Sequence, residues 1–194
     1  MRCLVSTAAL LLLVFAGCHG TARLEAIPLH PGAIDPPPPS TYRFDAQRCY
    51  WWTDANGDLV IVMQFDRYQL FAAIKQAKLN MSFVLNGMPE GQGRNYAVTA
   101  GSFRAVYAAG LLEDRFYATH GICGVLMKDD GRLTGSYRLW VQHHPGPGLF
   151  NLFPRQPSPL LFQGTFEAVR DDDGLGQAIL EATEAHGWGR AAQK

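Results

Sequence analysis

Histidine and cysteine side chains are the residues of this sequence best suited to chemistry. His120 and Cys123 are three positions apart, close enough for one metal site, and His143 or His144 could supply a later ligand. Adjacent residues of an extended chain point to opposite faces, so His143 and His144 would rarely hold the same ion. A thiolate ligand would also have to survive oxidation. We therefore expect no bound metal and no cofactor.

Nucleophilic catalysis has little support in the sequence. No Gly-x-Ser-x-Gly motif is present, and Ser102 and Ser136 lie in strand-like segments beside charged residues. A triad needs a base held beside the nucleophile by a third group, and no local spacing suggests one. A hydrolase or metal enzyme that uses His120, His143 or His144 stays as an alternative, although enzyme activity is not the favoured interpretation.

The N-terminal segment carries the most specific signal of the chain. Arg2 precedes an apolar run from Leu4 to Ala16, which has the length of a signal-peptide core and is too short to span a membrane. The ending Phe15-Ala16-Gly17-Cys18 resembles the lipobox of bacterial lipoproteins. That resemblance implies cleavage after residue 17 and acyl chains, such as palmitate, attached through Cys18. More than one chain would make the membrane anchor firm.

The same resemblance implies a location in the cell envelope. His19 follows the cysteine, where Asp would be the usual inner-membrane retention signal in enteric bacteria. The outer membrane is therefore favoured, if the cell has one.

A tether is predicted between the anchor and the globular part. Residues 18–41 combine the lipidated cysteine with Pro28, Pro31 and the run Pro36 to Pro39. Such stretches favour polyproline II, which acts as a semi-rigid spacer. A docking site for a proline-binding groove is the alternative. With residues 1–17 as the signal peptide, residues 42–194 form one β-rich domain, long enough for a single core.

Charge narrows the choice of partners. Lys and Arg together number 17, as do Asp and Glu, so the formal net charge is zero. A balanced charge argues against nucleic acid and against a strongly charged polymer. The membrane, reached through the lipid anchor, and an envelope protein or polymer remain as partners.

Two cysteines remain in the globular domain. In an oxidising envelope such a pair most often forms a disulfide, so we predict one between Cys49 and Cys123. Two buried thiols or a metal site are the alternatives. A simple pleat puts Cys49 on the face opposite Phe44, so the pairing depends on where Cys123 lies.

The body of the chain is typical of short strands. Residues 54–58 contain Asn-Gly, which predicts a hairpin turn between strands 42–53 and 59–65. The second of these strands is apolar on both faces and is therefore placed centrally in a sheet. Residues 79–86 alternate between apolar and polar types, and residues 128–132 predict another hairpin turn.

Three later segments share one pattern, in which Gly, a hydroxyl residue, an aromatic, a charged and an apolar residue follow each other. They begin at Gly101, Gly135 and Gly164. In a strand this order places the aromatic and apolar residues on one face, so we predict three half-buried strands with the aromatic ring inward.

Two helices complete the prediction. Residues 67–78 have helical apolar spacing, and Leu175, Ile179 and His186 recur in the same way after Asp171 to Asp173. The predicted fold class is mainly β: an antiparallel β-sandwich or flattened barrel with one or two peripheral helices.

Residues 143–159 form the longest irregular stretch and a candidate binding loop. Long ordered loops are often functional, and the apolar residues here could form a binding lip or rest against lipid. Alternatively the loop folds back over an open end of the domain, which is favoured because exposing two phenylalanines is costly. The candidate residues are His143, His144, Leu149, Phe150, Leu152, Phe153 and Arg155.

Taken as a whole, the sequence predicts a membrane-anchored envelope lipoprotein that is a non-catalytic interaction or structural module. The first alternative is a small-molecule carrier with an aromatic-lined interior. A tightly filled interior would speak against that alternative.

Overall fold

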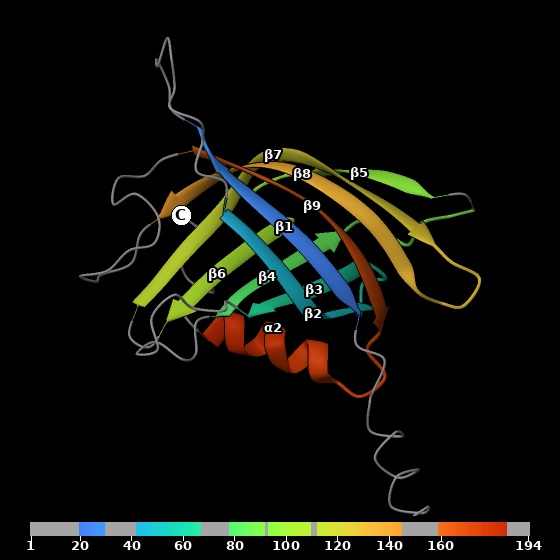
Figure 1. The fold of residues 1–194 in the computed structure, drawn as a ribbon. Coiled ribbons are helices and arrows are strands. Elements are labelled where there is room, and N and C mark those ends of the chain that lie inside the picture. The colour runs from blue at the N-terminus through green and yellow to red at the C-terminus, as the bar shows by residue number, and fades with distance from the viewer. Residues whose placement is uncertain are drawn as a thin grey trace, which may run out of the picture.

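The computed structural model describes residues 20–29, 42–66, 78–91, 93–109, 112–144 and 159–185. Within these ranges the chain forms nine strands and one helix (Figure 1). The elements are β1 (Thr21–Pro28), β2 (Tyr42–Thr53), β3 (Leu59–Asp66), β4 (Lys78–Leu85), β5 (Arg94–Val98), β6 (Phe103–Ala109), β7 (Leu112–Met127), β8 (Leu133–His144), β9 (Pro159–Arg170) and α2 (Leu175–Ala185).

Eight of the strands close into an antiparallel barrel. Each is paired with its neighbour in the order β1-β2-β3-β4-β6-β7-β8-β9, and β1 pairs with β9 to complete the circle. β5 pairs with the second half of β7, beyond the part of β7 that β6 covers. The prediction of a mainly β fold is confirmed. Of the sandwich and the barrel, the chain forms the barrel, because its first strand joins its last.

β1 occupies part of the segment that was predicted to be a tether. Ala22, Leu24 and Ala26 are buried inside the barrel, while the residues between them face outward. The prediction of a spacer is therefore wrong for residues 21–28. Pairing on both sides, with β2 and with β9, satisfies the backbone of this short strand and outweighs its modest hydrophobicity. The signal peptide, Cys18 and residues 30–41 lie outside the described residues.

β2 changes faces part-way along its length. Its register with β3 shifts between Ala46 and Arg48, which is a β-bulge. Phe44 points into the core before the bulge, and Cys49 and Trp51 point into the core after it. The prediction that Cys49 lies opposite Phe44 is thus wrong, because strict alternation does not continue across a bulge.

Both predicted hairpin turns are present. Gly57 N donates to Asp54 O at 3.1 Å, and Gly131 N donates to Lys128 O at 3.0 Å. The residues of β3 from Leu59 to Phe65 are buried on both faces, as predicted. The helix predicted over 67–78 lies outside the described residues except for Lys78, which begins β4.

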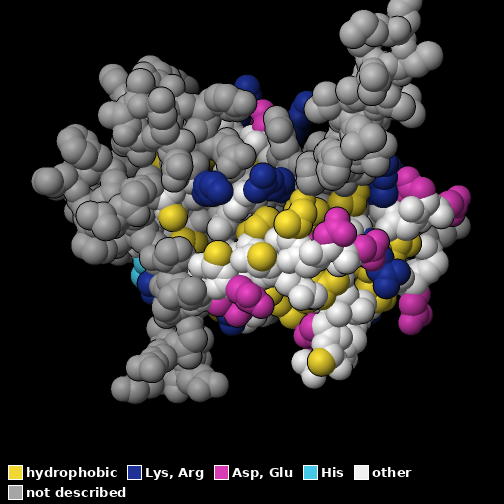
Figure 2. All heavy atoms as spheres, turned by 90° about the horizontal axis from the view of Figure 1, so that it is seen from below, with side chains coloured by type: hydrophobic (Ala, Val, Ile, Leu, Met, Phe, Trp, Pro, Cys, Tyr) yellow, Lys and Arg dark blue, Asp and Glu magenta, His cyan; other side chains and the backbone are white. Residues whose placement is uncertain are grey.

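α2 confirms the predicted C-terminal helix and packs against the outer side of β2 and β3. The carboxylate of Asp171 accepts hydrogen bonds from the amides of Gly176 and Gln177 at 2.9 and 3.0 Å, and so caps the helix. Ile179 packs in a small cluster with Tyr50 and its neighbours on β3. Figure 2 views this side, where charged side chains of both signs are scattered among apolar and uncharged ones.

The barrel interior is one continuous apolar core. The three repeated segments place their aromatic residues inward as predicted, at Phe103, Tyr137 and Phe166. A series of ring contacts, with centroids 5.0 to 6.4 Å apart, runs through this core in the order Tyr137, Phe83, Phe103, Phe162, Phe116 and His143. Close-packed rings of this kind occupy the space that a ligand would need.

Among the described residues, no helix is both long enough and apolar enough to cross a membrane.

Candidate binding surface

The three histidines that were candidates for chemistry lie on two sides of the barrel wall. His143 is fully buried inside, whereas His120 and His144 are exposed outside. In the described ranges no group of three or more His, Cys, Asp and Glu side chains could hold a metal ion. The structure therefore does not bring the sequence-predicted ligands together.

His143 belongs to the core and not to a loop, because β8 continues through His144. Its Nε2 atom lies 3.6 Å from Oδ2 of Asp114, and its ring stacks on Phe116 with centroids 5.0 Å apart. Asp114 is 4 % exposed. This buried polar pair was not predicted, although Asp114 has the same strand parity as Phe116, which places both side chains inside.

The other candidate loop residues are Leu149, Phe150, Leu152, Phe153 and Arg155, and they lie outside the described residues. The two strand ends that flank them are described. β9 begins at Pro159, whose carbonyl oxygen accepts a hydrogen bond from Leu29 N at 3.0 Å. This contact ties the start of β9 to the end of β1.

Cys49 and Cys123 are free thiols in the structure, so the prediction of a disulfide is not met. Both side chains are buried in the barrel core. Burial raises the pKa of Cys123 to about 12. Burial, and then the nearby Cys123, raise the pKa of Cys49. A dry interior disfavours the thiolate, which is the reactive form, so both groups are chemically quiet.

The outer face of β7 and β8 carries a group of exposed and half-buried side chains that contact one another. We call it the β7–β8 strip, made of Tyr117, His120, Ile122, Arg138, Trp140 and His144. The register sets His120 opposite Trp140 and Ile122 opposite Arg138. Ile122 is 59 % exposed and lies between Ala97 of β5 and Arg138 of β8.

Ring contacts hold the strip in a defined geometry. His120 stacks on Trp140 with centroids 4.7 Å apart and an interplanar angle of 13°. The guanidinium carbon of Arg138 lies 5.5 Å from the Trp140 ring centroid, within range of a cation–π interaction. Tyr117 and His144 meet edge to face at 5.0 Å. These contacts hold the side chains of the strip against one another.

A bulge explains why His120 faces outward. The register of β7 with β8 shifts between Ala118 and His120, so Ala118 points inside and the histidine points outside. The Thr119 hydroxyl donates to the carbonyl oxygen of Trp140 at 3.0 Å and lies 3.1 Å from Nδ1 of His120. Sequence reasoning singled out His120 as a metal ligand but missed its stacking partner, because the bulge is not visible in the pattern.

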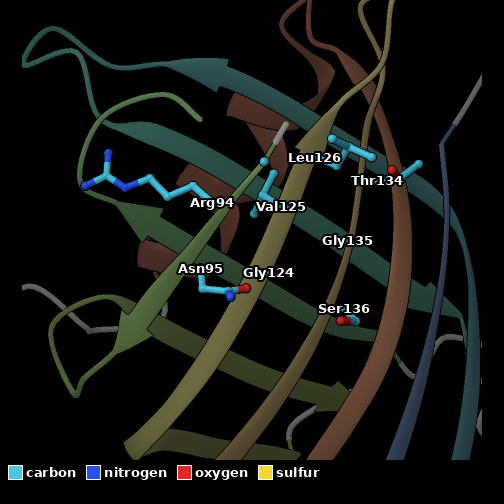
Figure 3. Close-up of a pocket in the computed structure, with 9 residues that line it drawn as sticks. Arg94, Asn95, Gly124, Val125, Leu126, Thr134, Gly135 and Ser136 are labelled. Atoms are coloured by element: carbon cyan, nitrogen blue, oxygen red, sulfur yellow. The ribbon is translucent and has the colours of Figure 1, made fainter. Parts of the chain in front are cut away.

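A hollow of about 490 Å³ adjoins the strip on the same outer face (Figure 3). It lies over β5, β7 and β8, and Gly124 leaves part of its floor without a side chain. Asn95 and Ser136 lie on two sides of Gly124, whereas the Arg94 side chain extends away from the hollow (Figure 3). Its guanidinium carbon lies 4.8 Å from the Tyr96 ring centroid. The hollow is therefore lined by small polar groups, and the charged group of Arg94 does not point into it.

Comparison with known proteins yields no match to a protein-family model, to a curated protein or to a solved structure, so the evidence on function is the chain's own geometry.

Proposed function

We propose that this protein is an envelope lipoprotein that works without catalysis, as a module that binds another envelope protein through the β7–β8 strip. One observation carries the proposal. The exposed side chain of Ile122 lies on the same outer face as the stacked rings of His120 and Trp140. The lipobox-like ending at Cys18 supports the anchor.

The packing of the interior favours the outer surface as the place of recognition. Phe83, Phe103 and Phe162 contact each other inside the barrel, with centroids 5.1 and 6.4 Å apart along the series. The carrier alternative would need these rings to move apart. An outer-surface module needs no such change.

The residue types of the strip suit a protein partner. Trp, Tyr and Arg are the residues that most often dominate the energy of protein interfaces, and Trp140, Tyr117 and Arg138 supply one of each. Ile122 adds apolar area between them. The positive charge of Arg138 favours an acidic group on the partner, because charge complementarity guides association. An envelope polymer is the other outcome to be tested.

Site-specific photo-crosslinking in intact cells tests the proposal. A photoreactive residue at Ile122 should give discrete adducts that contain the peptides of a second protein, since the partner is a protein. The matched control is the same residue at Asp45, whose side chain on the outer face of β2 is 82 % exposed. The proposal fails if Ile122 gives no adduct, gives the same adducts as Asp45, or gives adducts that contain no second protein.

The variant Trp140→Ala provides a second test in the same crosslinking experiment. It should abolish the adducts from residue 122 while the protein remains folded and membrane-bound, because the stacked ring no longer orders His120 and Arg138. Unchanged adducts in a folded variant would contradict the assignment of the strip.

A further inference from the structure

We propose that the barrel is oriented on the membrane, with the end that carries the 128–132 hairpin at the lipid headgroups and the end where β8 finishes directed away. This inference rests on the lipid anchor at Cys18 that is part of the proposed function. It concerns how the barrel faces the membrane, which the anchor alone does not decide.

The chain between the anchor and the barrel is very short. Only His19 and Gly20 separate Cys18 from Thr21, where β1 begins. Three Cα–Cα steps span at most about 11 Å. A long proline-rich spacer would have let the domain tumble freely, but a link of this length holds the start of β1 close to the bilayer surface.

The point at which the chain enters the barrel is also fixed. A Cβ atom on Gly20 would collide with the carbonyl oxygens of Cys49 on β2 and Glu167 on β9. The backbone of Gly20 is thus wedged between these strands, where β2 and β9 converge and pair at Tyr50 and Val169. Because Gly20 is held on both sides, the chain has no room to pivot there.

The surface around this entry point identifies the end that meets the membrane. Thr21 pairs with Glu167, whose carboxylate binds Arg132 at 2.6 Å and Lys128 at 3.1 Å on the β7–β8 hairpin. β9 ends only three residues beyond Glu167, at Arg170. The hairpin and the end of β9 therefore lie beside Gly20, where the chain enters the barrel, and Figure 1 places the start of β1 near the end of β9.

Two side chains at this end suit a headgroup surface. Arg170 and Leu175 flank the turn into α2, and Leu175 is 46 % exposed. An exposed leucine can lie among headgroups, and long basic side chains cover apolar surface while their charge stays in water. By contrast β8 runs 12 residues from the hairpin to His144, about 36 Å along the strand. The far half of the β7–β8 strip is thus held away from the bilayer.

Fluorescence quenching on vesicles tests the orientation. Lipidated mature protein is reconstituted in vesicles of phosphatidylethanolamine and phosphatidylglycerol that contain a nitroxide on the headgroup. Asp129→Cys labels the 128–132 hairpin, and Lys78→Cys labels the opposite end at the start of β4; both residues are exposed. The native thiols Cys49 and Cys123 are buried, so the unsubstituted protein gives the labelling background.

We expect strong quenching of the dye at residue 129 and at least several-fold weaker quenching at residue 78. A flexible linker of about 20 Gly and Ser residues inserted between His19 and Gly20 should abolish the difference, since such a chain is a random coil. Equal or reversed quenching in the protein without the linker overturns the orientation.

Mass analysis of the same preparation separates this failure from failure of the anchor. If the mature protein carries acyl chains and the quenching is equal, the orientation alone is wrong. If it carries no acyl chains, the anchor is wrong and the orientation falls with it.

Discussion

Tyr137 and Gly164 are direct cross-strand partners inside the barrel, and the tyrosine hydroxyl passes over the glycine to donate to the carbonyl oxygen of Arg23 at 3.0 Å. A Cβ atom on Gly164 would lie 2.6 Å from that hydroxyl and would collide with Arg23 O. The neighbouring pair of Gly135 and Phe166 has the same form, because a Cβ on Gly135 would collide with the phenylalanine ring. Each glycine makes room for the aromatic residue of the other strand.

Gly164→Ala is therefore expected to destabilise the barrel. The new methyl group must displace Tyr137 or the backbone of β1, and overpacking of this kind costs about 1–3 kcal/mol. Urea unfolding measures the change. Gly101→Ala is the matched control, because a Cβ there meets no atom within 4 Å, and it should leave the stability nearly unchanged. Equal loss in both variants would contradict the close approach at Gly164.

The buried thiols predict a loss of stability in alkali. Cys49 and Cys123 have folded pKa values above the usual cysteine value of about 8.5. Above that pH the unfolded chain releases two protons that the folded chain retains. Stability is therefore intact below about pH 8.5 and falls as pH rises toward 12, by about 1.4 kcal/mol per pH unit for each thiol.

The measurement is the free energy of unfolding at pH 8 and at pH 9, which is about one unit below the usual tyrosine pKa of about 10. The double variant Cys49→Ala, Cys123→Ala should be less stable at pH 8 because of the small cavities. Its free energy of unfolding should, however, change less between the two pH values. If its pH dependence matches that of the unchanged protein, the thiols are not the cause.

The lowered pKa of Glu167 predicts a loss of stability at acidic pH. Hydrogen bonds from Arg132 and then Lys128 lower the pKa of this carboxyl group. A lowered folded pKa contributes stability that is present above the usual Glu value of about 4.3 and is lost as pH falls through the folded value. Glu167→Gln should therefore be destabilised at pH 7, and the difference from the unchanged protein should shrink at pH 3. Asp45→Asn, at a fully solvated ion pair, is the control and should change little.

Asp171 predicts the cost of losing a helix cap. Its carboxylate accepts hydrogen bonds from two amides at the start of α2, so Asp171→Ala should cost about 1 kcal/mol. Asp173→Ala removes a neighbouring carboxylate of the same acidic run and serves as the control. Thermal unfolding followed by circular dichroism compares the two. Equal shifts in the midpoint would mean that general charge, and not the cap, sets the stability of α2.

Local patterns in the sequence predict the elements that depend on neighbours along the chain. The Asn-Gly turn after Asp54, the inward ring of Tyr137 and the helix through Ile179 all follow from local spacing. Closure of the barrel does not, since it depends on the pairing of β1 with β9, and no local pattern specifies a partner so distant. β1 itself has a visible alternation in Ala22 and Leu24, but the prolines that follow it suggested a spacer.

The candidate site was harder to predict than the fold, for a physical reason. Two bulges, one between Ala46 and Arg48 and one between Ala118 and His120, each reverse the faces of a strand. Beyond each of them every side chain changes sides, so Cys49 moves to the core and His120 moves to the surface. Alternation counted along the sequence does not reveal the extra residue that each bulge inserts.

The place of β1 between β2 and β9 also governs how this chain is assembled. Glu25 on β1 accepts a hydrogen bond from Gln163 on β9, 138 positions later. Until nearly the whole polypeptide is available for folding, the edge of β1 that pairs with β9 has no partner. Closing so long a loop is slow, and an exposed strand edge invites aggregation in the interval. We therefore expect the free edge of β1 to remain exposed until β9 pairs with it.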